Sequence, residues 1–248
     1  MAVPLSKRET CRLTRRLLLL QVLLNYRSMQ GEGYLYALWP WLRRSESRAP
    51  RVQAAAGFLN AHPVMASLAV GALRRRIEDG DAESRADELT SWKDSLCGPL
   101  GMVGDALIWD IWKPLIFALG ALILLLTRSP AAWVIVAAIC VLTYNAPLAW
   151  ARHWGVREGY RLGASVLSTL NHPLFSALPK YLGRAGAVAA GLLVGISLMA
   201  GSRMQLMGAA QFIVGFGLTW FALRRGIPLL YAVPVAMGAA LAVSLVRL

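Results

Sequence analysis

The stretch PLIFALGALILLLTRSPAAWVIVAAICVLTYNAPLAWAR, residues 114–152, decides the fold class. It holds two apolar runs, residues 114–126 and 131–151, joined by a connection with one arginine, Arg128. A helix needs about 20 apolar residues to cross the hydrocarbon core of a bilayer. The second run is long enough, and the first must extend back through Trp109. The stretch therefore predicts two helices that span a membrane.

Three more apolar runs follow toward the C-terminus, at residues 184–201, 205–223 and 227–246. The connections on one side of these runs are basic, with Arg152, Arg157, Arg161, Lys180, Arg184, Arg224 and Arg225. Those on the other side hold only Arg128, Arg203 and Arg247. Because basic connections face the cytoplasm, we expect five full crossings with the N-terminus inside and the C-terminus outside.

The composition agrees with a membrane protein, since 57% of the 248 residues are hydrophobic. The formal charge of +13 does not favour a nucleic-acid partner, because the basic residues flank apolar segments, where they set topology and bind anionic lipid. The three cysteines have no metal or redox spacing, and the sequence predicts neither a metal nor a cofactor. The apolar run at residues 17–24 is short and lacks a cleavage site, so we expect a retained amphipathic helix there.

The N-terminal part, residues 1–113, differs from the membrane part, residues 114–248. Residues 54–73 have a spanning length, but Pro63 breaks the helix beside Asn60 and His62. Such a break is tolerated at membrane depth only inside protein or along a cavity. The glycine-rich residues 96–108 predict a re-entrant loop that feeds a helix starting near Asp105. The acidic residues 78–88 predict a solvated hinge.

Polar residues beside the expected breaks are the candidates for a small-molecule site, because such sites combine a few hydrogen-bonding groups with an apolar wall. Asn60 and His62 fit this description, or they satisfy the carbonyls that Pro63 frees. Asn25 and Gln30 follow the first apolar run, where they bind the ligand or terminate the helix.

The next two candidates lie together near the start of the first spanning helix. Asp105 either accepts hydrogen bonds from a ligand's hydroxyl groups or is a helix N-cap. Trp109, one turn later, stacks on the ligand or belongs to an interfacial belt. Asp110 and Lys113 have the spacing of an ion pair, which favours a structural role for both.

Four segments, taken in order, resemble one known family. They are NYRSMQGEGYLYALWPWLRR (residues 25–44), FLNAHPVMASLAVGALRRRIE (58–78), LCGPLGMVGDALIWDIWKP (96–114) and WARHWGVREGYRLG (150–163). The order and content resemble the IID subunit of the mannose/fructose/sorbose family of the sugar phosphotransferase system. The block from Gly98 to Trp109 is the most specific, and the resemblance covers nearly the whole chain as one family domain.

The resemblance implies an all-α integral membrane protein of the bacterial inner membrane, with an inverted-topology relation to a IIC partner. IID and IIC together bind and translocate a hexose, which cytosolic IIB, supplied by IIA, phosphorylates. The IID chain itself carries no phosphorylated residue, and the family implies a trimer of IIC–IID heterodimers.

Several positions depart from the family pattern. Arg27 and Ser28 stand where the family usually has Glu-Arg, and Ala106, Asp110 and Lys113 also differ. The polar insertion near residues 201–205 is missing. These departures keep open a degenerate IID-like regulatory or scaffold subunit without transport. A separate alternative is an enzyme that acts on lipid or on a lipid-linked sugar, with Asp105, Asp110 and His62 as its catalytic residues. Which sugar is carried stays open.

Overall fold

The computed structural model describes residues 4–127 and 129–199, together with 213–214, 217–218, 221 and 225. Apart from two isolated β-bridges, the regular structure of this part is helical. The elements are α1 (Lys7–Leu17), η1 (Leu20–Leu23), α2 (Gly31–Leu42), α3 (Arg48–Ala56), α4 (Ala66–Glu78), α5 (Asp81–Ser84), α6 (Ala86–Gly104), η2 (Asp105–Trp112), α7 (Lys113–Leu126), α8 (Pro130–Leu162), η3 (Gly163–Asn171) and α9 (Pro173–Met199).

One continuous helix, Ala86–Leu126, runs through α6, η2 and α7. The re-entrant loop predicted for residues 96–108 is therefore wrong, and Asp105 is inside a helix instead of at its N-cap. A Cβ added at Gly98 or at Gly101 would have no neighbouring atom within 4 Å. Both glycines lie inside α6 and neither marks a turn. The η2 segment is a π-helix, whose wider turn precedes Pro114, a residue that cannot donate the normal helical hydrogen bond.

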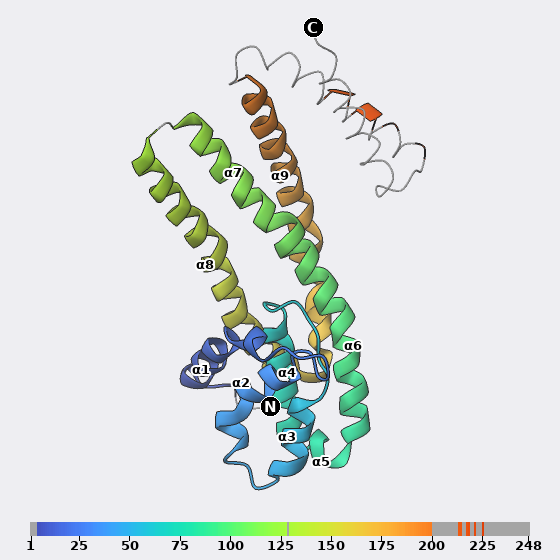
Figure 1. Ribbon diagram of the computed structural model, residues 1–248. Helices are drawn as coiled ribbons and strands as arrows, with labels where there is room; N and C mark the ends of the chain where they lie inside the picture. Colours follow the sequence, from blue (N-terminus) through green and yellow to red (C-terminus); the bar gives the residue numbers. More distant parts are fainter. Residues whose placement is uncertain are drawn as a thin grey trace.

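The long helices α7, α8 and α9 extend to one side of a cluster of short helices, α1 to α5 (Figure 1). Ala86–Leu126 and Pro130–Asn171 are long and apolar enough to cross a membrane. These two contain the runs predicted at residues 114–126 and 131–151. The third predicted run falls largely on α9, and the last two lie almost entirely outside the described residues. The count of five crossings stays a prediction.

The N-terminal helix α1 is amphipathic, but it ends at Leu17, and the amphipathic helix predicted at residues 17–24 is replaced there by the short 3-10 helix η1. Ser6 and Glu9 form a capping box at the start of α1, and Leu13 and Leu17 are buried. The Glu9 carboxylate also accepts a hydrogen bond from Arg74 of α4 at 2.6 Å. The same arginine donates to Glu78, whose other oxygen accepts the Tyr160 hydroxyl of α8. A chain of charged and polar groups thus connects α1, α4 and α8.

The helix α4 is the centre of the fold, because eleven of its thirteen residues are buried. It packs on α8 through glycines on both helices. A Cβ at Gly71 would lie 2.2 Å from the Val156 carbonyl oxygen, and one at Gly159 would lie 2.0 Å from the Leu68 carbonyl oxygen. Small residues allow two backbones to approach this closely, as in membrane helix pairs with small residues four apart.

Of the solvated hinge predicted at residues 78–88, residue 79 and residues 83–88 are exposed, whereas Asp81 and Ala82 are buried. Gly80 adopts a left-handed conformation (φ 90°), which a glycine accepts at little cost. Asp81 is buried and pairs with Arg76 at 2.5 Å, and Glu83 pairs with Arg51 of α3 at 2.6 Å. The acidic residues therefore attach α5 to α3 and α4.

Candidate binding site at the break between α3 and α4

The apolar segment predicted to break at Pro63 does break. Helix α3 ends at Ala56, α4 begins at Ala66, and residues 57–65 between them, called the break segment here, are not helical. Pro63 disfavours a helical conformation at His62, which accounts for the interruption at this position. Most of the break segment is buried, so its backbone groups need partners inside the protein.

Side chains from other elements supply several of these partners. Lys93 of α6 is buried and donates to the carbonyl oxygens of Ala54 at 2.6 Å and Gly57 at 3.0 Å, which caps the C-terminus of α3. The buried Gln30 amide donates to the Ala61 carbonyl at 2.6 Å and accepts from the Ala61 N–H at 3.2 Å. Gln30 therefore pairs with the break segment as a neighbouring strand would.

One face of α6 covers the other side of the break segment. Cys97 follows Lys93 by four residues and Gly104 follows it by eleven, and these spacings place all three on one side of a helix. The Asn60 N–H donates to the Cys97 Sγ at 3.3 Å. A Cβ at Gly104 would lie 2.2 Å from the Cβ of His62, so only glycine permits the observed contact.

His62 is the most buried of the candidate site residues together with Gln30, at 3% exposure for each. Its Nδ1 accepts a hydrogen bond from the Val64 N–H at 3.2 Å, which assigns the proton to Nε2. That Nε2 is buried and has no hydrogen-bond partner within the described part of the chain. The ring meets Trp109 of η2 edge-on, with 5.0 Å between centroids.

The structure brings four of the six predicted site residues to the break segment. These are Gln30, Asn60, His62 and Trp109. The Asn60 side chain and Trp109 are exposed, at 46% for the latter, so the segment has an accessible side. Asp105 follows Gly104 directly and is half-buried.

The Asn25 side chain is engaged in a local turn. Its Oδ1 accepts from the backbone N–H groups of Arg27 at 3.0 Å and Ser28 at 2.9 Å, and its Nδ2 donates to the Ser28 hydroxyl. These bonds build a turn after η1 and occupy the amide. Among the described residues, the ion pairs do not include the one predicted between Asp110 and Lys113.

Sequence reasoning missed four residues of this region: Tyr34, Lys93, Cys97 and Arg152. The Tyr34 hydroxyl and the Arg152 Nε are buried without a hydrogen-bond partner among the described residues. Arg152 of α8 lies near enough to His62 for its charge to act on the imidazole. The spacing of Lys93, Cys97 and Gly104 could have indicated that they share one face of a helix. That inference requires a helix that continues through Gly98. Among the described residues, no group of three potential metal ligands occurs.

Two solved structures have a fold similar to that of this chain. One solved structure, described as a membrane protein, aligns with a TM-score of 0.64 and 23% identity over 77% of this chain and 70% of that chain. A chain of the cryo-electron microscopy structure of the mannose transporter ManYZ with microcin E492 aligns with a TM-score of 0.57 and 20% identity over 96% of each chain. The chain thus shares its helical fold with both of these structures.

The family follows from the sequence. Residues 4–224 match the model of the mannose/fructose/sorbose family IID component of the phosphotransferase system, and the chain belongs to this family. The mannose-specific EIID component of Escherichia coli K12 is 26% identical over 178 residues, which cover 68% of this chain and 61% of the relative. The sorbose-specific EIID component of Klebsiella pneumoniae is 26% identical over 70% of this chain and 64% of the relative. The chain thus spans less than two thirds of either relative.

Proposed function

We propose that this chain is the IID subunit of a sugar permease that binds and translocates a hexose together with a IIC subunit. The observation that carries the proposal is the buried Nε2 of His62, which lacks a partner in the described structure beside the accessible ring of Trp109. Buried polar groups in proteins are nearly always hydrogen-bonded. A hydroxyl-rich ligand with an apolar face suits a lone ring nitrogen and an aromatic wall.

The same proposal includes the partners that the family suggests. IIC completes the sugar path in an inverted arrangement, and cytosolic IIA and IIB deliver the phosphate to the entering sugar. The chain lies in a bacterial inner membrane with its N-terminus in the cytoplasm, in a trimer of IIC–IID heterodimers. The likeness to one chain of the mannose transporter ManYZ supports a path that subunits share. Because half of the path belongs to IIC, this chain alone does not move sugar.

Two substitutions of His62 separate sugar binding from folding. An asparagine can accept the Val64 N–H in place of Nδ1 but offers nothing at Nε2, so His62→Asn keeps the local turn and loses the ligand bond. A glutamine reaches the Nε2 position instead. We expect His62→Asn to weaken hexose binding about 5- to 150-fold, the cost of one lost buried hydrogen bond. His62→Gln should retain more affinity and lose more stability.

The measurement is calorimetric titration of hexose into the purified IIC–IID complex, with melting temperatures recorded for each variant. Uptake of labelled hexose by cells that express this chain with and without IIC accompanies it. Unchanged affinity in His62→Asn would reduce His62 to a structural residue. Equal uptake by this chain alone would contradict the two-subunit path.

The regulatory alternative rests on Arg27, on Ser28 and on the missing polar insertion near residues 201–205, which lie outside the described residues. The structure places Arg27 at the exposed tip of the Asn25 turn, where its side chain holds none of the bonds that fix the break segment. This charge difference therefore leaves the candidate site intact. A complex that forms with IIC but neither binds nor carries any hexose would favour the scaffold role.

A further inference from the structure

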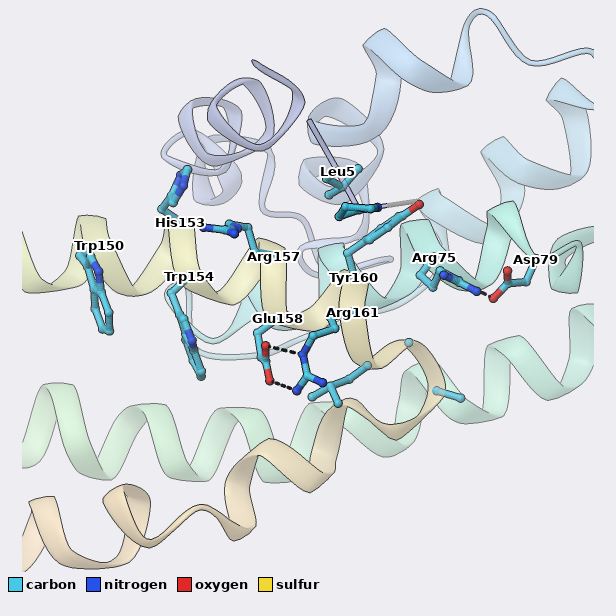
Figure 2. A pocket seen from close by; sticks show the side chains of 14 residues that line it. Leu5, Arg75, Asp79, Trp150, His153, Trp154, Arg157, Glu158, Tyr160 and Arg161 are labelled. Carbon is cyan, nitrogen blue, oxygen red and sulfur yellow. Dashed lines mark hydrogen bonds and ion pairs between the residues drawn. The ribbon is translucent and has the colours of Figure 1, made fainter. Parts of the chain in front are cut away.

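Two cavities flank α8 at the end of its apolar part. The first, about 1090 Å³, is lined by basic and aromatic residues of α4 and α8 (Figure 2). The second, about 810 Å³, is mostly apolar and is lined by residues of α4, η2, α8, η3 and α9. Trp150, Trp154, Glu158, Arg161 and Leu162 line both cavities, so the two adjoin along α8.

The first cavity has an excess of positive charge. Its two carboxylates are already paired, Asp79 with Arg75 at 2.7 Å and Glu158 with Arg161 at 2.9 Å. The nearby Glu78 is bound by Arg74 and Tyr160. Arg157 and His153 have no such partner among the described residues, and Arg157 is exposed. Figure 2 shows His153 and Arg157 above α8 and the two tryptophans below it in this view, and all four line the cavity. The cavity therefore suits an anion.

The place of the cavity along α8 indicates where that anion comes from. The apolar run of α8 ends at residue 151, and Arg157 lies six residues later, about 9 Å along a helix. Trp150 and Trp154 stack with 6.3 Å between centroids, and Trp150 is 65% exposed. Exposed tryptophans at the end of a spanning run are typical of the bilayer interface. Lipid phosphates lie at this depth.

The second cavity supplies the apolar half of such a site. It extends from Arg161 and Glu158 to Val64, Leu107 and Ile108, with Leu148, Ala151 and Phe175 along its walls. A soluble anion would leave this space unused, whereas an acyl chain fills it and buries apolar surface. The charged cavity and the apolar cavity are thus arranged as the head and the tail of one lipid.

We propose that the two cavities bind one anionic phospholipid, with its phosphate at Arg157 and His153 and an acyl chain beside Ala151. Basic pockets between spanning helices on the cytoplasmic side are a known mode of recognition for anionic headgroups. The lipid would hold α8 to η3 and α9, because its chain contacts all three. This inference does not depend on sugar transport by the chain.

The test uses the full-length protein in detergent and counts bound lipid by native mass spectrometry. The probes are phosphatidylglycerol, phosphatidylcholine with the same acyl chains, and glycerol 3-phosphate. We expect one phosphatidylglycerol to be retained in preference to phosphatidylcholine. Arg157→Gln should weaken this binding about fivefold, the contribution of one arginine near a lipid headgroup. Ala151→Phe, which fills the apolar cavity, should weaken both lipids without affecting a soluble anion.

Arg44→Gln is the matched control, because Arg44 is an exposed arginine beyond α2 and lines neither cavity. It should leave lipid binding unchanged. Equal retention of the two lipids, or equal loss of phosphatidylglycerol in Arg157→Gln and Arg44→Gln, would overturn the proposal. Full competition by glycerol 3-phosphate would assign the basic cavity to a soluble anion and overturn it as well.

Discussion

At the scale of single residues, the candidate site depends on two neighbours that touch across the break segment, His62 and Gly104. The Cβ that any other residue would carry at 104 has no space beside His62. Gly98 and Gly101, on the same helix, meet nothing within 4 Å at the corresponding position. The three glycines look alike in the sequence, but only one of them is required by a contact.

We therefore expect Gly104→Ala to displace His62, to lower stability by about 1–3 kcal/mol and to weaken hexose binding. Gly98→Ala and Gly101→Ala are controls within the same helix. Each should raise stability by about 0.5–1 kcal/mol or leave it unchanged, because alanine favours a helix over glycine. Thermal melts and hexose titration of the three variants measure this. A Gly104→Ala protein that behaves like the other two would contradict the described contact.

The sequence predicted what depends on local chemistry and missed what depends on packing. Pro63 limits the backbone of its own neighbours, so the break and the position of His62 within it were predictable. The bonds that occupy the Asn25 amide are also local, and the sequence allowed for such a turn. Lys93, in contrast, caps a helix that ends 37 residues earlier, at Ala56. No local pattern reports such a pairing.

At the scale of elements, the helix Ala86–Leu126 was the main surprise. The glycines and Pro99 of residues 96–108 predicted a loop. The whole segment is helical instead, and it continues into α7. Helix propensity is a weak preference that tertiary contacts override. The π-helical turn at η2 then widens the helix before Pro114. The two polar candidates Asp105 and Trp109 lie in this wide turn.

The docking of α1 is a second feature of this scale, and it depends on pH. The hydrogen bond from Arg74 lowers the pKa of Glu9 from its ordinary 4.5 to about 2. The pKa is lower in the folded protein, so the carboxylate stabilises the fold above pH 4.5. That contribution is lost as the pH falls from 4.5 toward 2. Because the Glu9 side chain is 43% exposed, solvent screens the pair, and we expect less than about 1 kcal/mol.

Glu9→Gln tests this docking, since glutamine can keep the capping box with Ser6 while it removes the charge. At neutral pH the variant should show faster hydrogen exchange in α1 than the wild type. At pH 3 the difference in exchange rate should shrink, because the Glu9 carboxylate of the wild type then stabilises the fold less. Exchange in α1 that is equal for the two proteins at neutral pH would show that Arg74 does not hold this helix.

At the scale of the whole molecule, the arrangement of the basic connections predicts the orientation in the membrane. Single cysteines at Glu83 of α5 or at Ser168 of η3 should not react with an impermeant thiol reagent in intact cells. Cysteines at Ser202, which lies outside the described residues, or after Leu248 should react. The background needs Cys11, Cys97 and Cys140 replaced, with serine at 97 to keep an acceptor for the Asn60 N–H. Labelling of Glu83→Cys would overturn the orientation.

The glycine contact between α4 and α8 limits how this molecule can diverge or be redesigned. Most helix interfaces absorb a larger side chain by a change of rotamer, but a carbonyl oxygen has no rotamer to change. The positions of Gly71 and Gly159 face the carbonyl oxygens of Val156 and Leu68. Neither position accepts even alanine while the two helices touch. A designer who varies the candidate site should therefore keep these glycines and α4 fixed, and place new side chains on α6 and η2, whose outer faces have room.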